Sequence, residues 1–295
     1  MEEIITSAQN PKIKKLLALQ QKSSERRSEG LFVVEGRREI EHCLEAGYEI
    51  DTVFVCTEIC GISPRASLGR DDNSVIPSID SVIPSLDGVI SSIDGVISSV
   101  VEKSPRVFEV SANVYDKIAY RSGTEGIIAE VRAKSLRLAD LQLSEHPLIV
   151  VLESVEKPGN LGAVLRSADA SGADAVIVCD PLTDLYNPNL IRSSIGSIFT
   201  VPCVACSSEE CIDFLKVHGI KILTAQLQDS ELYYDSDMKC GVAIVMGTES
   251  TGLTDIWRKA ADAHIRIPML GRLDSLNVSV SAAILLFEAV RQRNA

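Results

Sequence analysis

The stretch LIVVLESVEKPGNLGAVLRSADAS, residues 148–171, decides how the second half of the chain folds. Its first five residues are apolar, which is typical of a strand that is buried on both faces of a parallel sheet. From residue 160 onward apolar side chains recur at helical spacing, and Gly159 permits a tight turn between strand and helix. The stretch therefore predicts a strand, a loop and a helix in succession, with Asn160 as the N-cap of the helix.

The same alternation runs to the end of the chain. Strand-like runs and helical patterns follow one another, the strands at 148–152, 175–179, 201–204, 220–225 and 242–246, and the helices at 160–171, 188–195, 208–218 and 254–261. This alternation predicts an α/β fold with a mainly parallel sheet that is covered by helices on both faces. Ligands of such sheets bind beyond the carboxyl ends of the strands, so we expect a functional site in the loops at those ends.

The first part of the chain has a different pattern. A polar joint at residues 144–147 separates an N-terminal domain, residues 1–140, from a C-terminal domain, residues 145–295. An apolar helical stripe begins the N-terminal domain, and a helical run at 37–46 lies among strand-like runs at 31–34, 51–56, 107–110 and 127–131. These runs predict a small α/β domain that ends near residue 137.

A repeated segment interrupts the N-terminal domain at about residues 72–104. Residues 74–101 are four tandem heptads, SVIPSID, SVIPSLD, GVISSID and GVISSVV. A seven-residue apolar repeat is typical of coiled coils, but Pro77 and Pro84 exclude a helix interior. We therefore expect a poorly ordered insert in a surface loop, without a chemical role.

Composition limits the classes of function. No apolar run is long enough to span a bilayer, and residues 1–5 lack the basic start and apolar core of a signal peptide. We therefore expect a cytoplasmic protein whose eight cysteines are reduced. The net charge of −12 opposes nucleic-acid binding, because phosphate contact usually requires a basic surface.

One segment of this acidic chain is nevertheless basic. Between Asn10 and Arg38, eight lysines and arginines stand against three glutamates, and the candidates for RNA contact are Lys12, Lys14, Lys15, Arg26, Arg27 and Arg37. A local basic surface can hold an RNA backbone, although a solvated helix face explains the pattern equally well. Arg192 in the helical pattern 188–195 is a further candidate for phosphate or ribose contact, with a surface ion pair as the alternative.

Two later loops combine glycines with polar side chains at the ends of predicted strands. GTESTGL, residues 247–253, follows the strand-like run 242–246 and places one carboxylate, Glu249, between two glycines. IPMLGRLDSLNVSVS, residues 267–281, leads into a final helix through Val290 that is apolar on most faces. Such a helix requires burial on more than one side, which indicates a subunit interface.

Together the three loops resemble the signature of the SpoU, or TrmH-like, family of SPOUT RNA 2′-O-methyltransferases. The matching segments are NLGAVLRSA at 160–168, GTESTGL at 247–253, and IPML and SLNVSV between residues 267 and 280. The resemblance covers about residues 148–293 and implies a trefoil-knotted methyltransferase domain and a homodimer. The N-terminal domain is similar to the family's ribosomal-protein-like substrate-binding domain, from which the heptads depart.

The resemblance also implies that S-adenosyl-methionine is the methyl donor. The donor-binding positions it assigns are Met246, Gly247, Thr248, Glu249, Gly252, Ile267, Met269, Ser275, Leu276 and Asn277. The catalytic positions it assigns are Arg166, Asn160, Glu249, Ser275 and Asn277. Arg166 can act as the base that takes the proton of the ribose 2′-hydroxyl, or it can hold and polarise that oxygen while another group takes the proton. A guanidinium pKa above ~12 favours the second role.

The substrate that the resemblance implies is RNA. Large-subunit ribosomal RNA is favoured, because the two-domain arrangement resembles that of the ribosomal-RNA members of the family. A tRNA 2′-O-methyltransferase and a non-catalytic RNA- or ribosome-binding protein of the same fold are the alternatives. The missing GxGxxG pattern argues against a nucleotide-binding oxidoreductase.

No metal site is expected from the sequence. Cys203 and Cys206 have the CxxC spacing of zinc and redox sites, but no second pair follows, and Cys211 with His218 completes the set poorly. We therefore interpret these cysteines as thiols of a buried strand. The four histidines lie outside the three loops, which argues against a histidine-dependent nucleophilic mechanism.

Overall fold

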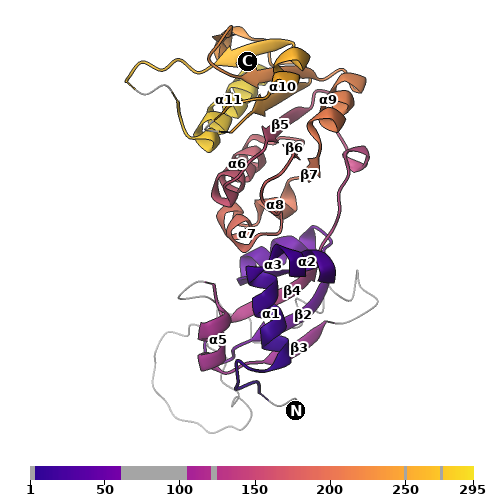
Figure 1. Cartoon of the computed structure of the whole chain (residues 1–295), viewed down its shortest axis with the longest axis vertical. Helices are drawn as coiled ribbons and strands as arrows, with labels where there is room; N and C mark the ends of the chain where they lie inside the picture. Colours follow the sequence, from indigo (N-terminus) through magenta and orange to yellow (C-terminus); the bar gives the residue numbers. More distant parts are fainter. Residues whose placement is uncertain (1–3, 61–104, 121–124, 249–250, 273–274) are drawn as a thin grey trace, which may run out of the picture. The chain divides into compact units, whose positions relative to one another are not determined.

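The computed structural model describes the chain except for residues 1–3, 61–104, 121–124, 249–250 and 273–274 (Figure 1). The chain divides into two compact units, residues 1–133 and 134–295. The heptad insert and Glu249 therefore lie outside the described residues. Among the helices that the structure describes, none is long and apolar enough to cross a membrane.

The N-terminal unit is a four-stranded sheet with helices. Its elements are α1 (Pro11–Gln21), α2 (Ser23–Glu29), β1 (Leu31–Glu35), α3 (Arg37–Glu45), β2 (Ile50–Val55), β3 (Arg106–Glu109), α5 (Ala112–Ile118) and β4 (Ile127–Arg132). The strand order is β1-β4-β2-β3, in which β4 is antiparallel to β1 and β2, and β2 is parallel to β3. All the predicted strands are present, whereas the short helices α2 and α5 were not predicted.

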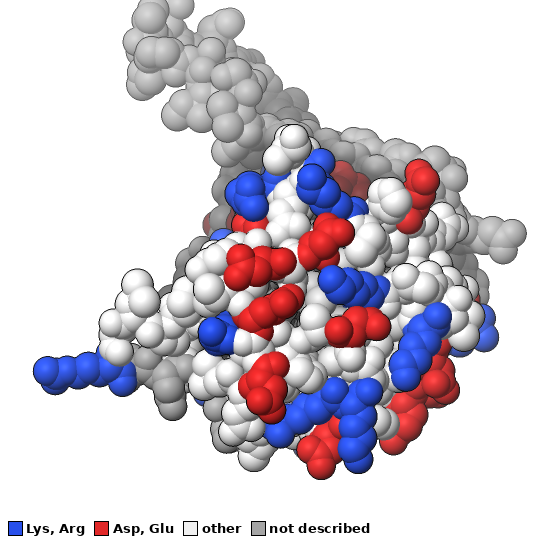
Figure 2. Space-filling view, turned by 90° about the horizontal axis from the view of Figure 1, so that it is seen from above, with Lys and Arg blue, Asp and Glu red and all other residues white. Residues whose placement is uncertain are grey.

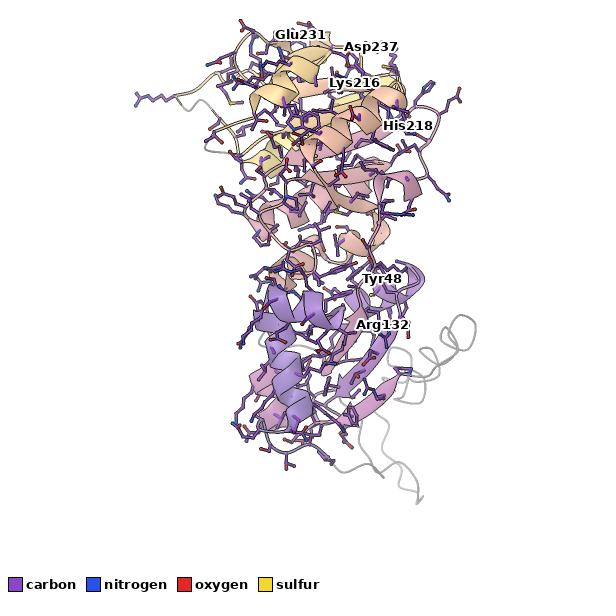
Figure 3. The ribbon with its side chains drawn as sticks, turned by 45° about the vertical axis from the view of Figure 1, so that its right-hand side comes forward. Tyr48, Arg132, Lys216, His218, Glu231 and Asp237 are labelled. Carbon is purple, nitrogen blue, oxygen red and sulfur yellow. The ribbon has the colours of Figure 1, made fainter. Side chains whose placement is uncertain are left out.

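Packing and charge both stabilise this unit. Ile13, Leu16 and Leu19 of α1 are fully buried, so the predicted helical stripe is the face that contacts the core. Arg132 at the end of β4 forms ion pairs with Glu49 at 3.1 Å and Asp51 at 3.0 Å. Figure 3 labels Arg132 among the side chains of this unit.

The C-terminal unit is built around a seven-stranded sheet. Its strands are β5 (Leu148–Glu153), β6 (Ala175–Cys179), β7 (Cys203–Cys206), β8 (Lys221–Ala225), β9 (Glu231–Leu232), β10 (Val242–Met246) and β11 (Ala263–Arg266). Its helices are η1 (Leu138–Asp140), α6 (Pro158–Ser171), α7 (Pro188–Ser194), α8 (Ser197–Thr200), α9 (Ser208–Val217), η2 (Tyr233–Asp235), α10 (Asp255–Ala260) and α11 (Val278–Arg293). The strand order is β7-β6-β5-β10-β8-β11-β9, and every pair of neighbours is parallel.

The parallel sheet confirms the expected α/β architecture, since helices cover both of its faces. Strand residues from β5, β6 and β10 share one buried cluster with α9 and with Trp257 of α10. On the other side, α6 and α11 contact each other and the strands β5, β6 and β10 (Figure 1). All residues of β5, β6 and β10 are buried, which explains why these strands are apolar throughout rather than alternating.

Two details of the sheet differ from the expectation. The third strand begins at Cys203 rather than Val201, because Val201 is the C-cap of α8 and its amide donates to the carbonyl of Ser197. The short strands β9 and β11 were not predicted. β11 has the sequence AHIR, which lacks the apolar run that identified the other strands.

Candidate functional site

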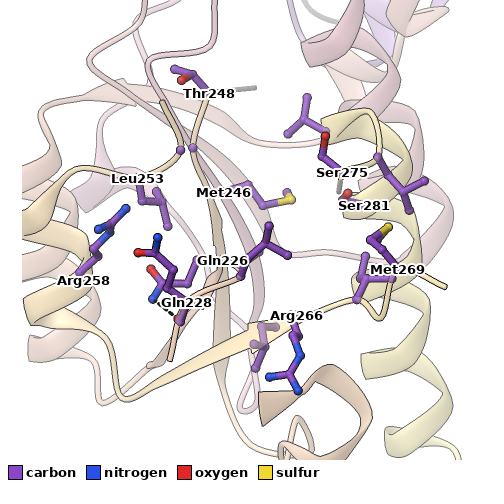
Figure 4. Close-up of a pocket in the computed structure, with 18 residues that line it drawn as sticks. Gln226, Gln228, Met246, Thr248, Leu253, Arg258, Arg266, Met269, Ser275 and Ser281 are labelled. Atoms are coloured by element: carbon purple, nitrogen blue, oxygen red, sulfur yellow. Dashed lines mark hydrogen bonds between the residues drawn. The ribbon is translucent and has the colours of Figure 1, made fainter. Parts of the chain in front are cut away.

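A cavity of about 320 Å³ lies beyond the carboxyl ends of β8, β10 and β11 (Figure 4). Its size is within the range of small-molecule sites. Loops after all three strands and the start of α11 contribute to its lining, which consists of Ala225, Gln226, Leu227, Gln228, Met246, Gly247, Thr248, Gly252, Leu253, Arg258, Ile265, Arg266, Ile267, Met269, Ser275, Leu276, Val278 and Ser281. The position agrees with the rule for ligand sites in parallel sheets.

The lining includes eight of the ten positions that the sequence assigned to a methyl donor, namely Met246, Gly247, Thr248, Gly252, Ile267, Met269, Ser275 and Leu276. Glu249 lies outside the described residues. Asn277 does not line this cavity, although its neighbours Leu276 and Val278 do.

The positions assigned from the sequence do not include the residues that β8 and its neighbours contribute to the cavity. Residues 225–228 follow β8, Arg258 belongs to α10, and Arg266 ends β11. The strand-like run 220–225 was recognised, and its carboxyl end was the signal that could have identified Gln226 and Gln228. No family motif includes these residues, and the position of β8 beside β10 is visible only in the tertiary structure.

Gly247 and Gly252 allow the loop after β10 to close on itself. Thr248 and Gly252 exchange two backbone hydrogen bonds, of 3.3 and 3.1 Å. A Cβ atom on Gly247 would lie 2.2 Å from the carbonyl carbon of Gly252, and Gly252 itself has a φ of +68°. Glycine is therefore required at both positions: at Gly247 because a side chain would meet the backbone of Gly252, and at Gly252 because the positive φ disfavours other residues.

The cavity contains an unusual buried acceptor. Gln226 Nε2 donates to the carbonyl oxygen of Gln228 at 2.9 Å, whereas Gln226 Oε1 is buried and has no hydrogen-bond partner within the described part of the chain. Figure 4 shows Gln226 and Arg258 across the cavity from Met269 and Ser275. Because an unpaired buried acceptor is costly, this oxygen fits a ligand that brings an amino or hydroxyl donor.

The other lining groups also fit S-adenosyl-methionine. Apolar side chains from several loops, including Leu253, Ile265 and Ile267, can enclose an adenine ring. Arg258 and Arg266 supply positive charge that can pair with the carboxylate of a methionine moiety. The residues present therefore provide an apolar surface, a hydrogen-bond acceptor and cations, as this donor requires.

A second cavity, of about 250 Å³, adjoins the first. It is lined by Leu152, Glu153, Val155, Glu156, Lys157, Asn160, Gly247, Thr248 and Val278, of which the last three also line the donor cavity. Glu153 is buried, and it accepts hydrogen bonds from the amide and hydroxyl of Thr254 at 2.9 and 2.5 Å. These bonds connect the loops that follow β5 and β10.

Asn160 and Asn277 meet beside the second cavity. Asn277 Nδ2 donates to Asn160 Oδ1 at 3.1 Å, and Asn277 Oδ1 caps α11 by accepting from the amide of Ser279 at 3.0 Å. The expectation that Asn160 is the N-cap of its helix was wrong. Pro158 is the first residue of α6, so Asn160 lies in the first turn and its side chain is directed to Asn277 instead.

Arg166 lies apart from both cavities. It is exposed on α6, lines neither cavity, and forms no ion pair or hydrogen bond with the residues that the structure describes. The motif places α6 close to α7, because a Cβ atom on Gly162 would overlap the Ser193 side chain. The structure of one chain thus brings Asn160 to the site but does not bring Arg166 there.

The candidates for RNA contact differ in exposure. Lys12, Lys14, Arg27 and Arg192 are exposed, and Lys15 and Arg37 are half-buried. Lys15 pairs with Glu29 at 3.5 Å and with Glu130 at 3.7 Å, and Lys12 Nζ lies 3.4 Å from the centre of the Phe108 ring. Figure 2, which is seen from above Figure 1 and looks onto the C-terminal unit, shows basic and acidic side chains mixed on that face.

Arg26 differs from the other candidates for RNA contact, because its side chain is buried. Its side chain is 5% exposed, and Nη1 donates to the carbonyl oxygens of Leu19 at 2.6 Å and Gln20 at 3.2 Å. These bonds attach α2 to the last turn of α1. The helix break at Lys22, where the backbone is extended, turns Arg26 inward and corrects the expectation that it contacts RNA.

Comparisons with known proteins agree with this site. The family model of the SpoU rRNA methylase family matches residues 147–287, and that of the MRM3-like substrate binding domain matches residues 10–129. The 23S rRNA (guanosine-2′-O-)-methyltransferase RlmB of Vibrio vulnificus is 38% identical over 191 residues, which are 63% of this chain and 77% of that protein. The 23S rRNA (guanosine(2553)-2′-O)-methyltransferase RlmP of Bacillus subtilis is 31% identical over 57% of this chain and 68% of that protein.

Solved structures resemble the whole chain. An RNA 2′-O ribose methyltransferase, 38% identical, superposes with a TM-score of 0.76 over 99% of this chain and 100% of that chain. An rRNA methyltransferase from Sinorhizobium meliloti with bound AdoMet, 27% identical, has a TM-score of 0.80 and covers 98% and 97% of the two chains. The chain therefore belongs to the SpoU rRNA methylase family and is an RNA 2′-O-methyltransferase that uses S-adenosyl-methionine.

Proposed function

We propose that this enzyme methylates the ribose 2′-hydroxyl of a guanosine in large-subunit ribosomal RNA. The observation that carries the proposal is the pair of adjoining cavities, which meet at Gly247, Thr248 and Val278. The donor occupies the larger cavity, and the ribose enters the smaller one so that its 2′-oxygen faces the methyl group. RlmB and RlmP are both named as guanosine 2′-O-methyltransferases of 23S rRNA, which supports this substrate.

The chain supplies binding and alignment to the reaction. S-adenosyl-methionine, when bound, provides an electrophilic methyl group on a positively charged sulfur. The ribose 2′-oxygen forms a bond to that carbon, the carbon–sulfur bond breaks with its electrons on sulfur, and the hydroxyl proton leaves to a base. Asn160, Ser275, Asn277 and Glu249 are the residues that we assign to orient the ribose and the donor for this transfer.

Arg166 is the residue that we assign to the 2′-oxygen. A guanidinium stays protonated at neutral pH, so it polarises and holds the oxygen rather than taking its proton. Because Arg166 lines neither cavity of its own chain, we assign it to the site of a partner subunit in a homodimer. Val280 and Phe287 of α11 are 47% and 48% exposed, and they offer apolar surface for such an interface.

The proposal includes a knotted backbone in the C-terminal unit. β10 lies between β5 and β8, although both of these strands precede it in the chain. α11 then packs against α6, the first long helix of the unit. A trefoil knot requires late segments to be enclosed by early ones, and this strand order and helix contact support it.

The proposed substrate and the free cysteines both support a cytoplasmic location. All eight cysteines are free thiols, as is usual in a reducing compartment. A protein that modifies ribosomal RNA must also meet that RNA during or after assembly. We therefore expect the enzyme to work in the cytoplasm as a homodimer.

Transfer of radiolabelled methyl groups tests the reaction. Large-subunit RNA and tRNA from cells without the gene are incubated separately with the enzyme and labelled S-adenosyl-methionine. We expect alkali-resistant label in large-subunit RNA, and we expect Arg166→Ala to remove it. Label in tRNA alone would overturn the ribosomal substrate, and an absence of donor binding would overturn the methyltransferase assignment.

The role of Arg166 is tested by Arg166→Lys. A lysine has a lower pKa than an arginine, so it would restore a base but not the two-pronged contact of a guanidinium. We expect Arg166→Lys to lose most of the activity, as Arg166→Ala does. Wild-type turnover in Arg166→Lys, with a rate that increases as the pH rises and reaches its plateau at a lower pH than in the wild type, would show that the residue acts as a base.

The assignment of Arg166 to the partner's site is tested by mixed dimers. Arg166→Ala and the donor-site variant Gly247→Val are each expected to be inactive. In a co-expressed mixture half of the dimers are mixed, and each has one complete site if the arginine acts across the interface, so about a quarter of the activity returns. No recovery, in dimers verified to be mixed, would place Arg166 in its own subunit's site.

A further inference from the structure

Three cysteines from separate segments meet at one edge of the parallel sheet. Cys179 ends β6, Cys206 ends β7, and Cys211 lies near the start of α9. Their Sγ atoms all lie within 4.8 Å of one another. None of these residues lines either cavity, so the cluster is separate from the methyltransferase site.

The fold explains why the three thiols converge. β6 and β7 are parallel neighbours, and Cys179 is paired in register with Cys206. α9 begins directly after Cys206, where Ser207 and Glu210 form a capping box. The first turns of α9 therefore pass back over the strand ends and place Cys211 beside the other two sulfurs.

We infer that Cys179, Cys206 and Cys211 form a binding site for one soft d10 metal ion, Zn²⁺ or Cu⁺. Thiolates are the ligands that these ions prefer. Three sulfurs bound to one ion at ~2.3 Å lie roughly 4 Å apart, so the cluster needs only small movements to close around it. A Cu⁺ ion can be satisfied by three thiolates, and a Zn²⁺ ion would keep a fourth position open to water.

The surroundings of the cluster suit such an ion. Cys179 and Cys211 are fully buried, whereas Cys206 is half-buried and leaves a route for entry. The nearby carboxylates of Asp180 and Glu210 add negative charge, but both are engaged by hydrogen bonds, to Ser208 at 2.6 Å and to the amide of Ser207 at 2.9 Å. The sulfurs are therefore the atoms available as ligands.

The three thiols also share their protons unevenly. Hydrogen bonds from Cys179 and Cys211 lower the pKa of the Cys206 thiol to about 4. The same hydrogen bond with Cys206 raises the pKa of Cys179. All three thiols must release their protons when a metal ion binds, because the thiolate is the form that ligates the metal.

Cys203 provides a matched control within the same strand. It belongs to the CxxC pair, but three residues along a strand place two side chains on opposite faces. Its sulfur accordingly lies outside the cluster. The site therefore uses Cys206 together with Cys179, which lies 27 positions earlier in the chain. The CxxC spacing of Cys203 and Cys206 does not contribute to the site.

Metal titration of the reduced, metal-free full-length protein tests the site. Co²⁺ serves as a spectroscopic probe, because thiolate ligands give a charge-transfer band, and Zn²⁺ and Cu⁺ are added in separate arms against chelators of known affinity. We expect one ion per chain. Cys206→Ser and Cys211→Ser should bind at least about 100-fold more weakly, and Cys203→Ser should bind as the wild type does.

The change in unfolding temperature on adding metal is a second test of the site, and it can be applied even if a serine variant is unstable. The ion joins β6, β7 and α9, so it should raise the unfolding temperature of the wild type and of Cys203→Ser, but not of Cys206→Ala. Equal binding by Cys203→Ser and Cys206→Ser would overturn the site. A disulfide among the three cysteines that forms readily under mild oxidation, with no metal bound under reducing conditions, would replace it with a redox function.

Discussion

At the scale of single residues, Gly247 is expected to control donor binding. Its Cβ would meet backbone atoms of Gly252 at 2.2 and 2.3 Å, and backbone atoms cannot yield as a flexible side chain can. Overpacking of this kind costs about 1–3 kcal/mol, so Gly247→Ala should weaken donor affinity by about 10-fold or more in calorimetric titration. Gly159→Ala is the control, because nothing lies within 4 Å of the added methyl group. Equal affinities in the two variants would contradict this role for Gly247.

Gln226 is the second residue that the donor cavity makes testable. Its buried Oε1 atom is without a partner among the described residues, and a donor group of the ligand would satisfy it. Gln226→Leu should weaken donor binding by about 5-fold, since a hydrogen bond contributes on the order of 1 kcal/mol. Gln228→Leu should have less effect, because the side chain of Gln228 is exposed and only its carbonyl binds Gln226. The reverse order would show that Gln226 faces away from the donor.

At the scale of elements, the start of α11 combines a stabilising cap with a contact of the site. Asn277→Ala removes the cap on Ser279 and should cost about 1 kcal/mol of folding free energy. Asn277→Asp keeps an oxygen acceptor and should restore most of that stability in urea unfolding. If both variants are as stable as the wild type, the cap does not contribute to stability, and the role of Asn277 is its hydrogen bond to Asn160.

The helices α1 and α2 are the elements expected to contact RNA. Lys14 and Arg27 are exposed on these helices. When the logarithm of the binding constant is plotted against the logarithm of the salt concentration, each phosphate contact contributes about 0.9 to the magnitude of the slope. Replacing both by alanine should therefore reduce that slope by about 2 in filter-binding measurements. Lys216→Ala on α9 is the control (Figure 3). An unchanged slope in the double variant would show that Lys14 and Arg27 do not contact the RNA.

At the scale of the whole molecule, one buried carboxylate makes stability depend on pH. Burial raises the pKa of Glu130 above its ordinary value, although the nearby Lys15 lowers it. The folded chain then binds this proton more tightly than the unfolded chain, so the stability it contributes is present at low pH. That contribution is lost as the pH rises through the raised pKa.

Glu130→Gln should therefore be more stable than the wild type at about pH 8, by on the order of 1 kcal/mol, and the difference should vanish near pH 4. Lys15 retains Glu29 as a partner in this variant. Glu29→Gln is the control, because an exposed ion pair contributes little at any pH. A stability gain that is the same at both pH values would exclude titration of Glu130 as its cause.

The sequence by itself determined the kinds of elements and their alternation. Apolar runs such as 148–152 and 242–246 are strands, and the parallel sheet follows from their alternation with helices. The family resemblance of the three loop motifs also identified eight of the eighteen residues that line the donor cavity. These features were predictable because periodicity and turn residues act over a few neighbouring positions.

Only the tertiary structure decided which distant segments meet. It placed β10 between β5 and β8, brought Gln226 into the donor cavity, and turned Arg26 into the packing of α1 and α2. It also brought Cys179 beside Cys206 and Cys211, whereas the sequence had argued against a metal site because no second cysteine pair follows the CxxC pair. The physical reason is that strand order and register depend on burial and hydrogen bonds between residues far apart in the chain, and local spacing has no information about these.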